Sequence, residues 1–158
     1  MKTIKTEYMG IVHQYDVAVR WESGRVGELT SPDFAEKLNV VTPPEFPSGI
    51  AGHWSPEHLF TAAVNGCLMT TFLAIAENSK LSYDHFESNG SGKLEMVDGK
   101  YMMTEVTLSP TLIIKQEADR ERAMRVLQKA EAACLISNSI KSKIIFRPEV
   151  RVAEFVPA

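Results

Sequence analysis

Residues 55–78 read SPEHLFTAAVNGCLMTTFLAIAEN, and this stretch carries the clearest helix signals in the chain. Ser55 is a good N-cap because its hydroxyl can accept a hydrogen bond from a free amide of the first turn. Pro56 at the first helical position loses nothing by lacking an N–H, and Glu57 suits the positive end of the helix dipole. Apolar residues occupy almost every side of the helix, so we expect it to be largely buried in a core or an interface.

This helix contains Cys67, and the only other cysteine, Cys134, is predicted at the end of a second helix. A cysteine on an apolar helix is usually a small hydrophobic packing residue, but two thiols can also form a redox couple, and the residue pattern leaves both interpretations open. A mid-helix cysteine gains little from the helix dipole. A reactive thiolate would therefore need a guanidinium from elsewhere, and Arg20 and Arg25 in the N-terminal strands are the candidates.

Length and composition predict one globular domain over residues 1–158, with 44% hydrophobic and 23% charged residues. The net charge of −3 gives no electrostatic reason to expect nucleic acid or an anionic membrane as a partner. The N-terminus lacks the apolar core of a signal peptide, and polar residues interrupt the long apolar helix, so we expect a cytoplasmic protein without a membrane span. Neither the cysteines nor the four histidines have metal-ligand spacing, and no cofactor motif is present.

The remaining elements are predicted from periodicity and turn residues. Asp98-Gly99 suits the tight turn of a hairpin, and Asn89-Gly90-Ser91-Gly92 inside its first strand is interpreted as a bulge rather than a phosphate loop. In chain order we expect a strand over 8–21, a turn around Arg25, a strand near 36–42, a Pro/Gly-rich loop over 43–54, the helix, hairpin strands over 84–96 and 101–114, an amphipathic helix over 116–134, an interruption at 137–139 and a last strand over 143–152. This order predicts an α+β fold with an antiparallel sheet.

Three segments together resemble the OsmC/Ohr family, the osmotically induced protein C and organic hydroperoxide resistance proteins, over nearly the whole chain. Ser23-Gly24-Arg25-Val26-Gly27 is similar to the family's arginine turn. Ser55-Pro56-Glu57-His58-Leu59-Phe60, leading to Gly66-Cys67, is similar to its Asn-Pro-Glu helix. Ala133-Cys134-Leu135-Ile136-Ser137-Asn138 is similar to its second-cysteine motif, Cys-Pro-x-Ser-Asn. The chain departs from these motifs at Ser55, His58, Leu68 and Leu135, which leaves the subgroup open.

The resemblance implies an intertwined homodimer with antiparallel sheets and long buried central helices. It also implies a thiol-dependent peroxidase that reduces organic hydroperoxides. Cys67 would be the peroxidatic cysteine and Cys134 the resolving one, while Arg25 would hold Cys67 as a thiolate and Glu57 would orient Arg25. The resulting disulfide would be reopened by an external dithiol or lipoyl-type reductant, because nothing in the sequence supplies electrons.

Two other functions compete with this interpretation. The first is a non-enzymatic OsmC-like dimer that binds a small apolar ligand or senses oxidants. The second is a cysteine-dependent hydrolase that uses His53 or His58 as its base. The apolar loop residues Phe46, Ile50 and Trp54 could form an entrance for bulky organic peroxides or could equally be structural.

Overall fold

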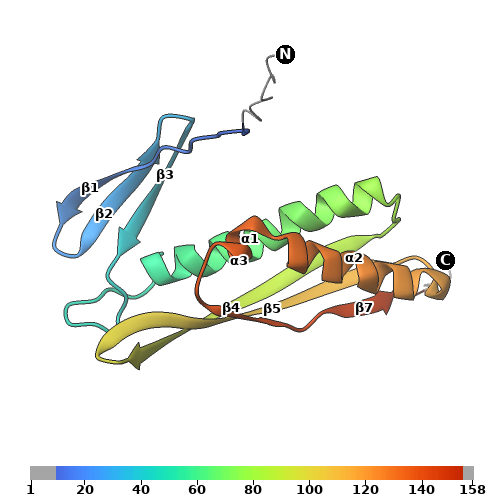
Figure 1. Ribbon diagram of the computed structural model, residues 1–158. Coiled ribbons are helices and arrows are strands. Elements are labelled where there is room, and N and C mark those ends of the chain that lie inside the picture. Colours follow the sequence, from blue (N-terminus) through green and yellow to red (C-terminus); the bar gives the residue numbers. More distant parts are fainter. Residues whose placement is uncertain (1–9, 155–158) are drawn as a thin grey trace, which may run out of the picture. The chain divides into compact units, whose positions relative to one another are not determined.

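The computed structural model describes residues 10–154, and the chain divides into two units, one ending at Trp54 and the other beginning at Ser55. The first unit is a three-stranded antiparallel sheet of β1 (Ala18–Ser23), β2 (Val26–Ser31) and β3 (Phe34–Val41), in that order (Figure 1). Residues 10–17 form no regular structure, so the predicted strand over 8–21 is wrong over those positions, and residues 8 and 9 lie outside the described residues. The turn around Arg25 is confirmed, whereas β2 was not predicted as a separate strand.

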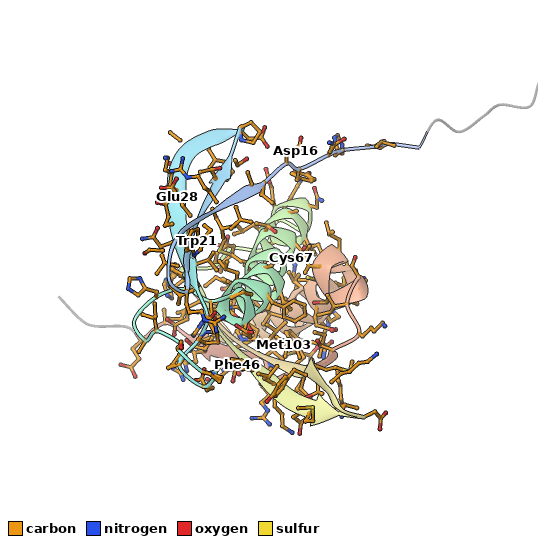
Figure 2. The ribbon with its side chains drawn as sticks, turned by 90° about the vertical axis from the view of Figure 1, so that its left-hand side faces the viewer. Asp16, Trp21, Glu28, Phe46, Cys67 and Met103 are labelled. Atoms are coloured by element: carbon orange, nitrogen blue, oxygen red, sulfur yellow. The ribbon has the colours of Figure 1, made fainter. Side chains whose placement is uncertain are left out.

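The first sheet has one apolar and one charged face. Trp21 is paired with Gly27 and Val19 with Leu29, so these side chains share a face by the two-residue period of a strand. Val19 and Trp21 are about two-thirds to three-quarters exposed, at 67% and 73%. The opposite face carries Glu28, which pairs with Arg20 and with Lys37. Figure 2 labels Trp21 and Glu28 on this sheet. Within the first unit, these two apolar side chains are therefore largely uncovered.

The second unit is organised around α1 (Pro56–Asn78), which begins and ends as predicted. The amide of His58 donates to the Ser55 hydroxyl at 3.3 Å, confirming the N-cap. Only one stripe of the helix is buried in the core: Val64, Leu68, Phe72 and Ala76. By length and composition α1 is the one helix in residues 10–154 that could cross a membrane, although the core helix of a globular protein meets the same criterion.

Strands β4 (His85–Val97) and β5 (Lys100–Ile114) form the predicted antiparallel hairpin against α1. The bulge lies at Lys93/Leu94, beyond the four residues that were predicted to form it. The glycines have a different role. A Cβ atom on Gly92 would overlap the Thr61 hydroxyl, and one on Gly90 would lie 3.1 Å from the Asn65 Cβ. They are required because the strand passes very close to α1.

The last predicted strand is two short strands, β6 (Lys143–Phe146) and β7 (Glu149–Val152), separated at Pro148. Both pair with β5, and both pair in parallel, because α2 carries the chain back to the same end of the sheet. The fold class α+β is confirmed, but this sheet is mixed rather than purely antiparallel. Pro110 lies on β5 between the two paired stretches, where a residue without an N–H costs no ladder hydrogen bond.

Helix α2 (Arg120–Ala133), preceded by the 3-10 turn Glu117–Asp119, packs beside α1 on the sheet (Figure 1). The predicted interruption at 137–139 is largely a short helix, α3 (Leu135–Asn138), with Cys134 as the residue between α2 and α3. The side chains that fill the core come from α1, β5, α2 and β7, among them Leu68, Phe72, Leu108, Leu112, Ala123, Leu127 and Val150. This packing brings the middle of α1 against the start of α3.

Candidate functional site

Cys67 is half-buried on α1, on the side of the helix that faces α2 and α3 (Figure 2). Its position follows from the helix period. Val64 and Leu68 lie in the buried stripe, and Cys67 lies one residue before Leu68, about 100° away around the axis. The thiol is thus at the edge of the core, where it is partly shielded and still within reach of solvent.

Several neighbouring groups act on the ionisation of the Cys67 thiol. Partial burial alone would raise the pKa of this thiol. The backbone amide of Ile136, the Cys134 thiol, the Thr71 hydroxyl and the backbone amide of Leu135 act against it, and the pKa of Cys67 is lowered below its ordinary value. A group that lowers an acid's pKa stabilises its charged form, so these contacts favour the thiolate.

Cys134 has the opposite tendency. It is fully buried at the junction between α2 and α3. Burial raises its pKa, and the neighbouring Cys67 raises it further, while the hydroxyl and amide of Ser137 act in the other direction. The two cysteines that the sequence singled out therefore interact and differ in acidity. Cys67 tends to be ionised, and Cys134 tends to keep its proton.

Thr71 lies one helical turn after Cys67, with its hydroxyl oxygen 3.9 Å from the cysteine sulfur. The side chain is half-buried. Sequence reasoning missed this residue and the amides of α3. Thr71 could have been found from its spacing, because residues four apart lie on the same helix face. No comparable signal identifies the amides of Leu135 and Ile136, since their approach to Cys67 depends on how α3 packs.

Glu57 is in the first turn of α1, ten residues before Cys67, so the two are separated by about 15 Å along the helix axis. Glu57 therefore does not contact the thiol of its own chain. Its Oε2 atom is buried and has no hydrogen-bond partner among the described residues. An unpaired buried carboxylate oxygen is costly, and a guanidinium is the group best suited to satisfy it.

The two candidate arginines differ in their surroundings. Arg20 is already engaged on the charged face of the first sheet, where its guanidinium bonds Glu22 at 2.9 Å and Glu28 at 3.3 Å. Arg25 is exposed in the β1–β2 turn, and within its own unit no ion pair involves its guanidinium. Arg25 is thus the one with a guanidinium available for another partner. It belongs to the first unit, whereas Glu57 and both thiols belong to the second.

His58 has a structural role at the start of α1. Its Nδ1 atom lies 2.7 Å from the Ser55 hydroxyl, so the two side chains pair at the helix cap. It lies nine residues before Cys67, about 13.5 Å along the axis and on the opposite side of the helix. It is too distant to act as the base for this thiol. Among residues 10–154, no group of three or more His, Cys, Asp or Glu side chains could hold a metal ion.

Comparison with known proteins agrees with this architecture. The model of the OsmC-like protein family matches residues 49–149. An OsmC-like protein of unknown function from Vibrio cholerae has a similar fold, with a TM-score of 0.78 at 20% identity, covering 87% of this chain and 99% of the other. An organic hydroperoxide resistance protein from Elizabethkingia anophelis, with thiocyanate bound, has a TM-score of 0.73 at 19% identity, covering 92% of this chain and all of the other (100%).

A Bacillus subtilis protein, YmaD, described as uncharacterized, is 21% identical over 145 residues, which cover 89% of this chain and 95% of that protein. At such identities the solved structures establish a common fold and leave the chemistry to be argued from the site. The family model spans most of the chain and includes Glu57, Cys67 and Cys134. This chain therefore belongs to the OsmC-like family.

Proposed function

We propose that this protein is a thiol peroxidase that reduces organic hydroperoxides to alcohols, with Cys67 as the attacking thiol and Cys134 as the resolving thiol. The proposal rests on the interaction between the two cysteines, through which each changes the pKa of the other: the pKa of Cys67 is lowered and that of Cys134 is raised. A peroxide is attacked by a thiolate, so the more acidic and more accessible cysteine is the one suited to attack. Similarity to organic hydroperoxide resistance proteins supports the choice of substrate class.

The reaction proceeds in three steps. The Cys67 thiolate attacks one oxygen of the peroxide, the O–O bond breaks, and the other oxygen leaves as an alcohol after taking up a proton, which converts Cys67 into a sulfenic acid. The Cys134 thiol then attacks that sulfur, forming a disulfide and releasing water. An external dithiol, for which a lipoyl group is one candidate, reopens the disulfide by thiol–disulfide exchange and is itself oxidised.

Arg25 and Glu57 are proposed to assist the first step. The buried Oε2 atom of Glu57 has no hydrogen-bond partner among the described residues, and the Arg25 guanidinium has no ion pair within its own unit. A carboxylate–guanidinium pair would satisfy both groups. The arginine would then stabilise the thiolate and polarise the peroxide, as its charge favours the ionised form of a nearby thiol.

We also propose that the functional form is a homodimer. Small and apolar side chains cover the solvent face of α1, where Ala62, Ala63, Gly66, Met69 and Leu73 are all exposed. Gly66 has no atom within 4 Å of where a Cβ would be, so that position is open to an approaching helix. A contiguous apolar face of this kind marks an interaction surface, and a second copy of the chain supplies a matching one.

The dimer is tested by changing Gly66 to Leu and measuring the mass of the particle by sedimentation equilibrium. We expect Gly66→Leu to dissociate the dimer, because a large side chain prevents two helices from approaching closely. Gln128→Leu is the matched control, since Gln128 is an exposed position on α2 outside this face. A wild-type protein that sediments as a monomer, or a Gly66→Leu dimer as stable as wild type, would contradict the proposal.

The catalytic proposal is tested by following hydroperoxide consumption in the presence of a dithiol. Cumene hydroperoxide is suitable because it is a bulky organic peroxide. We expect rapid consumption by the wild-type protein and none above background by Cys67→Ser, because a serine hydroxyl is not ionised at neutral pH. Consumption no faster than buffer by the wild type would favour the non-enzymatic binding or sensing role. Ester hydrolysis without peroxide would favour a hydrolase. A cytoplasmic location remains part of this proposal.

A further inference from the structure

The three threonines of α1 make different hydrogen bonds. Thr61 donates to the carbonyl of Glu57 at 2.9 Å, and Thr70 donates to the carbonyl of Cys67 at 3.1 Å. Such bonds to a carbonyl of the preceding turn are the usual choice for a hydroxyl within a helix. Thr71 does not follow this pattern: its hydroxyl oxygen lies 3.9 Å from the Cys67 sulfur. The Thr70 hydroxyl thus bonds the main-chain carbonyl of Cys67, and the Thr71 hydroxyl lies near the side-chain sulfur of the same residue.

Ionisation of Cys67 decides the direction of this contact. In the neutral form either the thiol or the hydroxyl can donate. A thiolate has no proton, so Thr71 must then be the donor. The hydroxyl therefore favours the charged form of Cys67 over the neutral form.

Other groups of the second unit also act on the ionisation of Cys67. Burial raises the pKa of this thiol, while the backbone amides of Ile136 and Leu135 and the Cys134 side chain act to lower it. In the second unit, Cys134 is the only titratable group among the described residues whose effect reaches Cys67.

We propose that Thr71 is a positioning residue for the reacting thiol, which donates a hydrogen bond to the ionised Cys67 sulfur from one helical turn further along α1. This inference rests on the proposed peroxidase function and deepens it. It assigns part of the activation of Cys67 to groups within its own unit. The thiol then remains activated to some extent even without Arg25.

The role of Thr71 is tested by the pH dependence of Cys67 alkylation with iodoacetamide, followed by mass spectrometry of the peptide that contains Cys67. We expect Thr71→Val to lower the rate at pH 7 by about three- to tenfold, as a higher thiol pKa leaves less thiolate. The rate on the high-pH plateau should stay close to that of wild type, because all variants are then ionised. A general loss of structure would change the plateau as well.

Two matched variants isolate the hydroxyl. Thr71→Ser keeps a hydroxyl at the same position and should recover most of the wild-type profile. Thr70→Val removes the neighbouring hydroxyl, which bonds the main chain, and should leave the profile unchanged. Thr71→Ala serves the same purpose as Thr71→Val if the valine variant does not fold. A Thr71→Val or Thr71→Ala profile that coincides with that of Thr70→Val would overturn the role of Thr71.

These measurements involve no peroxide, so their failure is distinct from failure of the proposed function. Normal peroxide consumption with unchanged alkylation profiles would overturn the present inference and leave the peroxidase intact. Shifted profiles in a protein that does not consume peroxide would uphold the role of Thr71 and overturn the peroxidase.

Discussion

Cys67 of α1 and Cys134 at the junction of α2 and α3 interact, and each changes the pKa of the other. The interaction connects two segments that are far apart in the sequence of the second unit, since α1 lies before the β4–β5 hairpin and α3 lies after α2. The acidity of the pair is asymmetric: burial and its neighbour raise the pKa of Cys134, while hydrogen-bond donors outweigh burial at Cys67. This asymmetry assigns different chemical roles to two residues of the same type.

The first prediction concerns the order in which the thiols react as pH rises. The pKa of Cys67 is lowered and that of Cys134 is raised, so Cys67 becomes a thiolate at the lower pH. We expect iodoacetamide to modify Cys67 before Cys134 at every pH from 6 to 9 (roughly the range around an ordinary thiol pKa). Peptide mass spectrometry measures both rates in one sample. Earlier modification of Cys134 would show that the roles of the two cysteines are reversed.

The second prediction separates the two candidate arginines. Arg25→Ala should slow hydroperoxide reduction at neutral pH and recover part of the rate at higher pH, because one nearby cation lowers a thiol pKa by about 1–3 units. Arg20→Ala should change little, since Arg20 is paired with Glu22 and Glu28.

The pH titration of Cys67 alkylation in both arginine variants provides the measurement. If only Arg20→Ala shifts the titration, Arg25 has been assigned wrongly. If neither variant shifts it, the donors within the second unit account for the ionisation of Cys67 by themselves.

The third prediction concerns the contact between β4 and α1. Gly92→Ala should lower the free energy of unfolding by about 1–3 kcal/mol, because the added methyl overlaps Thr61, whose hydroxyl is fixed by its bond to the carbonyl of Glu57. Ser91→Ala is the matched control, because residue 91 lies on the opposite face of the strand and is exposed. Urea unfolding gives the comparison. Equal stabilities of the two variants would mean that the strand can move away from the helix at no cost.

Local signals in the sequence were sufficient for the elements that depend on neighbouring residues. The Ser55-Pro56 entry to α1 and the Asp98-Gly99 hairpin turn were both confirmed, because caps and tight turns are determined within a few residues. The strand over residues 10–17 was wrong, since a period of two does not show whether a pairing strand is available. The parallel pairing of β6 and β7 is likewise non-local and follows from the return of the chain through α2.

The candidate site was also predicted only in part, because local motifs identify residues but do not show which groups the fold brings next to them. Cys67 and Cys134 were identified from motifs, and the structure brings them together. The sequence indicated that a guanidinium would be needed to ionise Cys67. Within the second unit, the Thr71 hydroxyl lies 3.9 Å from the Cys67 sulfur, and two backbone amides also lower the pKa of Cys67; the guanidinium stays a prediction. Backbone groups carry no residue-specific signal, and the direction of a threonine hydroxyl depends on which carbonyl a neighbour has already occupied.

Attack by Cys67 and resolution by Cys134 both leave a trace in the intact mass of the protein after one equivalent of cumene hydroperoxide. We expect the wild-type chain to lose two hydrogens, with a disulfide between Cys67 and Cys134 in the peptide map. The Cys134→Ser chain should instead gain one oxygen on Cys67, because its sulfenic acid has no resolving thiol, and further equivalents of peroxide should add more oxygen as the higher oxides form. The same mass change and time course in both proteins would show that Cys134 does not resolve the oxidised Cys67.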